Sequence, residues 1–122
     1  MASYLGLHHV ALTVPLARLE EARRFYSDVL GMAEMPRPDD ALEVPGIWYR
    51  MGDAELHIRC GEKDRRDRTG NHIAIIADGV DGLHGRLEAQ GVEVTELSLL
   101  LGRERFYARD PFGHRIEFTS PP

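Results

Sequence analysis

Four residues of the kinds that bind metal ions stand out in the sequence: His9, His57, His72 and Glu117. Each lies in a short stretch where apolar and polar residues alternate, and each falls on the polar side of that alternation. Imidazole nitrogens and carboxylate oxygens are the groups that hold Zn, Ni, Co, Mn or Fe(II) in proteins. If the four stretches converge as strands, the sequence predicts a divalent metal site and an enzyme built on it.

The alternation also predicts the direction of these side chains. Successive side chains of a β-strand point to opposite faces, so the apolar residues of each strand share the face that meets the helices. Those apolar residues are Val10, Leu12 and Val14; Leu56, Ile58 and Cys60; Ile73, Ile75 and Ala77; and Ile116 and Phe118. The candidate ligands therefore point away from the helices, and a register slip of one residue would bury all of them.

The elements that carry these residues form two similar halves. The first half predicts a strand over 7–14, a helix over 15–30 ending at Gly31, and strands over 47–51 and 54–60. The second predicts a strand over 71–77, a helix over 80–90 ending at Gly91, a short strand over 92–94, and strands over 104–109 and 114–119. Gly31 and Gly91 are 60 positions apart, as are His57 and Glu117.

This repeat predicts an α+β protein made of two βαβββ modules. We place module one at about 5–60, a charged, glycine-bounded linker at about 61–70, and module two at about 71–120. Neither half alone offers much core, so residues 1–122 are predicted to form a single domain.

Composition excludes several classes of function. A net charge of −5 argues against a nucleic-acid partner, which usually requires a basic surface. No apolar run approaches the roughly 20 residues that span a bilayer, and no secretory signal is visible at the start. The single cysteine, Cys60, rules out an internal disulfide and fits a reducing compartment. We therefore expect a cytoplasmic protein that binds neither membranes nor nucleic acid.

The last hairpin offers a further candidate, Tyr107. A four-residue loop would pair Phe106 with Glu117 and mix apolar with charged residues on one face. A five-residue loop over 110–114 pairs Tyr107 with Glu117 and leaves one apolar face, so we prefer it. Tyr107 then lies beside Glu117, where a phenol can hydrogen-bond a substrate or act as an acid; the alternative is a rim tyrosine without chemistry. Of the other histidines, His84 is expected on the surface and His114 in a local turn role.

Four segments, LHHVALTV, FYSDVLGM, NHIAIIA and RFYARDPFGHRIEF, resemble the vicinal oxygen chelate superfamily. That superfamily includes glyoxalase I, bleomycin-resistance proteins, fosfomycin-resistance enzymes, methylmalonyl-CoA epimerases and extradiol dioxygenases. The resemblance implies paired βαβββ modules whose strands curl into a mixed-sheet cup around a divalent metal, with the helices outside.

The resemblance places the ligands on the opening and last strands of each module, at His9, His57, His72 and Glu117. The family commonly has glutamate or glutamine at the position of His57, and Glu55 on the same face competes for that role. Some relatives use only three ligands, which correspond to His9, His72 and Glu117.

The favoured reaction is that of a glyoxalase-I-like lyase or isomerase. In such enzymes a metal chelates two neighbouring oxygens of a small substrate, sometimes with a thiol cosubstrate, and a base moves a proton between adjacent carbons. Glu117 or Glu55 is the candidate base. Arg59, Arg115 and Thr13 lie on the side of the ligands as candidate substrate contacts, the two arginines for an anionic group.

Other members of the family suggest different functions. Two histidines and one carboxylate suit an Fe(II) extradiol dioxygenase, but that family's signature has a histidine where this chain has Ser98, Leu99 and Leu100. A metal-free bleomycin-resistance-type binder and a fosfomycin-type thiol transferase are further alternatives. The resemblance also implies a homodimer, in which each cup is completed by one chain or by two.

Overall fold

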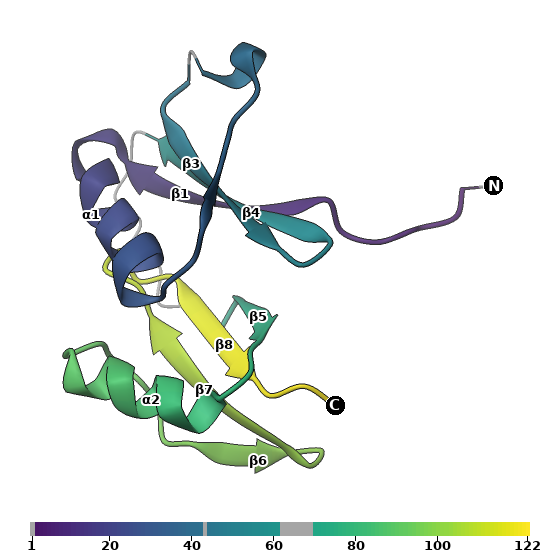
Figure 1. Ribbon diagram of the computed structural model, residues 1–122, viewed down its shortest axis with the longest axis vertical. Helices are drawn as coiled ribbons and strands as arrows, with labels where there is room; N and C mark the ends of the chain where they lie inside the picture. The colour runs from purple at the N-terminus through teal and green to yellow at the C-terminus, as the bar shows by residue number, and fades with distance from the viewer. Residues whose placement is uncertain (1, 43, 62–69) are drawn as a thin grey trace. The chain divides into compact units, whose positions relative to one another are not determined.

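The computed structural model describes residues 2–42, 44–61 and 70–122, and it contains two compact units, Met1–Asp64 and Arg65–Pro122 (Figure 1). Each unit is a βαβββ module with one four-stranded mixed sheet, which confirms the predicted α+β fold class. Of the predicted linker, residues 62–69 lie outside the described residues. The assignment of both modules to a single domain stays a prediction.

The first unit opens with strand β1 (His9–Pro15) and one continuous helical segment. That segment begins as a 3₁₀ turn, η1 (Leu16–Arg18), continues as α1 (Leu19–Arg23) and ends as a π-helical turn, η2 (Arg24–Val29). The amide of Leu30 bonds to the carbonyl of Phe25, the wide spacing of a π turn. Gly31 follows with φ +76°, as the predicted helix end requires.

Three further strands complete the first sheet: β2 (Glu34–Met35), β3 (Gly46–Met51) and β4 (Ala54–Gly61), with a short 3₁₀ turn, η3 (Asp39–Ala41), between β2 and β3. The strand order is β1-β4-β3-β2, and β1 runs parallel to β4. The sequence pattern did not predict β2, because a two-residue strand shows no alternation.

The second unit repeats this topology with β5 (His72–Ile76), α2 (Val80–Ala89), β6 (Ser98–Leu100), β7 (Arg103–Arg109) and β8 (Arg115–Thr119). The strand order is β5-β8-β7-β6, and β5 runs parallel to β8. The predicted strand over 92–94 is wrong: the segment makes a single bridge, from Val94 to Ala108, beside β7. Among the described residues, no helix is long and apolar enough to cross a membrane.

The apolar faces of the strands are as predicted. In β4, Leu56 and Ile58 are buried, and in β8, Ile116 and Phe118 are buried between half-exposed polar neighbours. Strand β5 alternates in the same sense, with Ile73 and Ile75 less exposed than His72, Ala74 and Ile76. The alternation therefore assigns the polar side chains of each sheet to the face opposite its buried residues.

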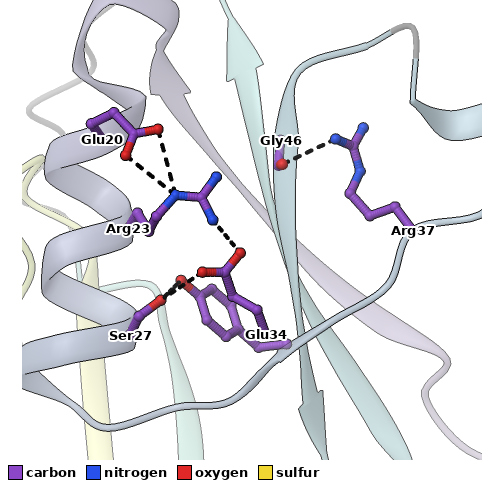
Figure 2. Close-up of polar contacts among 7 residues, drawn as sticks. Glu20, Arg23, Ser27, Glu34, Arg37 and Gly46 are labelled. Carbon is purple, nitrogen blue, oxygen red and sulfur yellow. Dashed lines mark hydrogen bonds and ion pairs between the residues drawn. The ribbon is translucent and has the colours of Figure 1, made fainter.

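Side-chain contacts attach the helical segment to the edge of the first sheet (Figure 2). Arg23 donates to the carboxylate of Glu34, and Ser27 Oγ lies 3.2 Å from Glu34 Oε2 and 2.8 Å from Tyr49 Oη. Burial raises the pKa of the Tyr49 phenol. Because Glu34 and Tyr49 are direct partners across β2 and β3, these contacts fix the strand that carries Trp48 on its opposite face.

Candidate metal centre

The two sheets place their ligand-type residues at equivalent strand positions. In the first, Ala11 of β1 pairs with His57 of β4, and His9 lies two residues before Ala11. In the second, Ala74 of β5 pairs with Glu117 of β8, and His72 lies two residues before Ala74. Each unit therefore presents one pair, a histidine on its opening strand and a second ligand-type residue on its closing strand.

In the first unit the pair is part of a stack of three rings. The ring of His57 lies 4.1 Å from that of His9 at an interplanar angle of 12°, and 4.0 Å from that of Trp48 at 2°. This stacking leaves His57 only 8% exposed, although it lies on the polar side of its strand. Trp48 was not predicted as a site residue; the signal for it is the alternation of β3, which places it on the same face.

Glu55 is held by two neighbours. Its Oε1 lies 2.8 Å from Nε2 of His57, and its Oε2 lies 3.5 Å from a guanidinium nitrogen of Arg50. The hydrogen bond from His57 lowers the pKa of the Glu55 carboxyl, so it stays ionised at lower pH than an ordinary glutamate. One imidazole nitrogen of His57 thus already has a carboxylate partner.

In the second unit the pair is in direct contact. Nε2 of His72 lies 3.1 Å from Oε1 of Glu117, and Nδ1 of the same ring lies 2.9 Å from the carbonyl oxygen of Gly70. A backbone carbonyl can only accept, so Nδ1 carries a proton and Nε2 is the nitrogen directed at Glu117. This is the arrangement in which a histidine binds metal through Nε2 while a backbone acceptor orients the ring.

The predicted register of the last hairpin is confirmed. Tyr107 pairs with Glu117, Arg109 pairs with Arg115, and the loop between β7 and β8 spans five residues, 110–114. The ring of Tyr107 meets that of His72 edge to face, with centroids 5.1 Å apart.

Arg105 is a site residue that the sequence reasoning missed. Its Nε lies 3.3 Å from Oε2 of Glu117, and its guanidinium also donates to the hydroxyl of Tyr107. The signal is again alternation, because Arg105 lies two residues before Tyr107 in β7 and therefore shares its face.

Comparison with known proteins decides the family. A model of the Glyoxalase/Bleomycin resistance protein/Dioxygenase superfamily matches residues 6–118. The chain belongs to this superfamily. A crystal structure of a glyoxalase family protein from Bacillus anthracis is 34% identical, and the match covers 100% of both chains with a TM-score of 0.88.

Structures of lower sequence identity share the fold of this chain. Lactoylglutathione lyase from Agrobacterium tumefaciens is 21% identical over 97% of this chain and 95% of its own, with a TM-score of 0.70. The fosfomycin resistance protein FosX from Listeria monocytogenes is 21% identical over 100% and 96%, with a TM-score of 0.69. No protein of curated function matches the chain.

The three residues predicted to contact substrate lie where the alternation placed them. Arg59 of β4 pairs with Thr13 of β1, and its Nη1 lies 3.4 Å from the Thr13 hydroxyl. Arg115 stacks its guanidinium over the ring of Tyr107, 3.6 Å from the centroid.

The remaining histidines make local contacts. The ring of His114 bonds to Asp110 at 2.7 Å, in the turn role that was predicted. His84 lies half-exposed on α2, in line with the expected surface position, with its Nε2 2.8 Å from the carbonyl oxygen of Thr95 and its ring edge to face with that of Phe106.

The donor set fits a divalent metal in kind, since imidazole and carboxylate are the usual ligands of Zn, Ni, Co, Mn and Fe(II). Within the described ranges, the structure gathers no three His, Cys, Asp or Glu side chains into one group that could hold a metal. What each unit supplies is one pair of donors.

Cys60 gives a test of the first sheet that does not involve metal. Burial raises the pKa of its thiol, and the thiolate is the form that reacts with alkylating agents. We expect iodoacetamide at pH 8 to modify Cys60 more slowly than a free cysteine peptide, with the rate still rising as the pH passes the ordinary thiol range. Urea-unfolded protein should react at the peptide's rate; equal rates for folded and unfolded protein would contradict the burial.

Proposed function

We propose that the protein is a divalent-metal-dependent enzyme, a glyoxalase-I-like lyase or isomerase that acts on a small oxygenated substrate. The observation that carries the proposal is the repetition of a ligand-type pair at equivalent strand positions: His9 with His57 and His72 with Glu117. A pattern of this kind recurring in both halves of a repeat is hard to explain by packing alone, since each pair lies opposite the buried face.

The proposed ligands are His9, His72 and Glu117, with a fourth from His57 or Glu55. His57 is enclosed between two rings and its Nε2 is bonded to Glu55, an arrangement that supports Glu55 as the ligand with His57 orienting it. The alternative is that His57 exchanges Glu55 for metal. The candidate metals are Zn, Ni, Co, Mn and Fe(II).

When bound, the metal would polarise a substrate carbonyl and hold a neighbouring oxygen. The chain's own residues would move the proton. Glu117 is the proposed base, with its second carboxylate oxygen held by Arg105, and Glu55 is the alternative. The Tyr107 oxygen accepts a hydrogen bond from Arg105, so its own O–H is available as a donor toward substrate.

The remaining proposals follow from sequence and family. Arg59, Arg115 and Thr13 are proposed substrate contacts, and a thiol cosubstrate is compatible with the reaction. We also propose a homodimer in the cytoplasm, with no nucleic-acid or membrane partner. Sedimentation of the purified protein at micromolar concentration checks the oligomeric state.

An Fe(II) extradiol-type dioxygenase is the second candidate. The position of Tyr107 directly opposite Glu117 and edge to face with His72 favours it. Against it, residues 98–100 form the edge strand β6 and provide no histidine.

Metal content is the deciding experiment. We expect protein purified without chelator to carry close to one divalent ion per chain, and chelator-treated protein to gain thermal stability when that ion is restored. The loaded enzyme should then turn over a thiohemiacetal, whereas oxygen uptake with catechols under Fe(II) would indicate the dioxygenase. Absence of metal, with no thermal shift from any of the five ions, would contradict both and leave a metal-free binder of the bleomycin-resistance type.

A further inference from the structure

One strand position carries opposite charges in the two units. In the first sheet, Glu55 of β4 lies opposite Arg50 of β3, and the two side chains form an ion pair at 3.5 Å. In the second sheet, the equivalent position of β8 holds Arg115, opposite Arg109 of β7. The next pairs on the same face of these strands, Trp48 with His57 and Tyr107 with Glu117, show that the positions correspond.

Like charges directly opposite in a sheet are normally destabilising. Arg109 donates to the carbonyl of Gly113, which turns its guanidinium toward the hairpin loop. Arg115 has different contacts: the face of the Tyr107 ring at 3.6 Å and the carbonyl of Gly70 at 3.4 Å. Among the described residues, no carboxylate forms an ion pair with Arg115.

A second guanidinium approaches the same ring. Arg105 lies 4.6 Å from the Tyr107 centroid and donates to its hydroxyl, so two cations converge on one phenol. By strand alternation the polar face of this sheet carries four arginines, at 103, 105, 109 and 115, and Glu117 is the one carboxylate on the strand positions of that face. This concentration of positive charge occurs in a chain whose net charge is −5.

We propose that Arg105, Arg115 and the hydroxyl of Tyr107 form a binding site for an oxyanion group: a carboxylate, phosphonate or phosphate. Guanidinium groups present paired N–H donors that match such oxygens, and the Tyr107 O–H adds a further donor. Glu117 offsets one of the two cations, and an incoming anion offsets the other. Assignment of this anion to the substrate rests on the function proposed above, whereas anion binding itself requires no metal.

Arg59 and Arg115, the two arginines expected to hold an anionic group, have different surroundings. Arg59 is exposed and its guanidinium contacts Thr13 of the neighbouring strand, while Arg115 belongs to the cluster around Tyr107. The site for the anion is therefore placed in the second unit, and Arg59 is not part of it.

The test uses the full-length, chelator-treated protein with inorganic phosphate as the first probe and acetate as the second. Both are titrated against chloride at constant ionic strength and followed by calorimetry and thermal unfolding. We expect the wild-type protein to bind one probe in preference to chloride; phosphate indicates a phosphate or phosphonate substrate, and acetate a carboxylate. Removing one charge-assisted contact by Arg115→Gln should weaken that binding at least about tenfold.

Matched variants separate a site from general attraction of anions. Arg86→Gln removes the same charge from the exposed side of α2 and should leave the affinity unchanged. Arg115→Glu recreates the Arg50–Glu55 pairing, so it should retain thermal stability while abolishing binding, and Arg115→Lys should bind with an intermediate loss because it keeps charge without the paired donors. Equal affinities in Arg86→Gln and Arg115→Gln, or no binding of either probe by the wild type, would overturn the proposal. Because the anion titration uses metal-free protein, a failure to bind metal would not change its outcome. Likewise, a failure to bind the anion would not contradict the proposed metal site.

Discussion

Glu117→Ala is expected to lower the affinity for divalent metal at least about 100-fold and to remove metal-dependent turnover. Glu117 is proposed both as a ligand and as the base, and it is in contact with His72 and Arg105. Its removal leaves the Arg105 guanidinium without its carboxylate partner and takes away an anionic donor. Competition with a chromophoric chelator measures the affinity, and kcat/KM measures the turnover.

A matched control is available on the same hairpin. Glu104 lies in β7 on the opposite side from Arg105 and is exposed, so Glu104→Ala removes a carboxylate without touching the proposed site. That variant should bind metal as the wild type does. His72→Ala should resemble Glu117→Ala, and unchanged metal affinity in both variants would refute the assigned centre.

The same assay identifies the fourth ligand. If Glu55 binds the metal, Glu55→Gln should lower the affinity more than His57→Gln, because the second change would remove only the group that orients the carboxylate. If His57 binds the metal, the order reverses. The structure favours the first outcome, since Glu55 bridges His57 and Arg50 while His57 is enclosed by Trp48 and His9.

The faces of the strands and the register between β7 and β8 could be predicted from the sequence because each has a local cause. Alternation alone sets which side chains share a face, and only a five-residue loop puts Phe106 and Ala108 on the same side as Ile116 and Phe118. The pairing of Tyr107 with Glu117 then follows without knowledge of the rest of the fold.

The contacts of Arg105 and Trp48 could not be predicted in the same way. Alternation places both residues on the ligand face, but the ring stack depends on β3 pairing with β4, and the bond to Glu117 depends on which way a long side chain turns. The segment over 92–94 is a case in which the sequence predicts a strand that the structure does not form. Val92 and Val94 have high strand propensity, but only Val94 pairs with β7. The bridge to Ala108 consists of two backbone hydrogen bonds, from the amide of Thr95 to the carbonyl of Tyr107 and from the amide of Arg109 to the carbonyl of Glu93.

The second large effect is expected from Asp110, which holds the loop between β7 and β8. Its side chain is fully buried, with Oδ1 accepting from the amides of Phe112 and His114 and Oδ2 bonded to the His114 ring at 2.7 Å. Asp110→Ala would leave buried donors without an acceptor, so we expect it to lower the free energy of unfolding by about 3 kcal/mol or more. Urea denaturation measures this loss.

Asp110→Asn should cost much less, because the amide oxygen can still accept the two backbone bonds and its nitrogen can donate to an unprotonated Nδ1 of His114. His114→Ala should fall between the two, since it removes one bond and keeps the backbone acceptor. The loop also sets the register that brings Tyr107 beside Glu117. A folded Asp110→Ala protein should therefore lose affinity for both metal and anion. A variant with wild-type stability would mean that the turn is held by the packing of Phe112 rather than by this carboxylate.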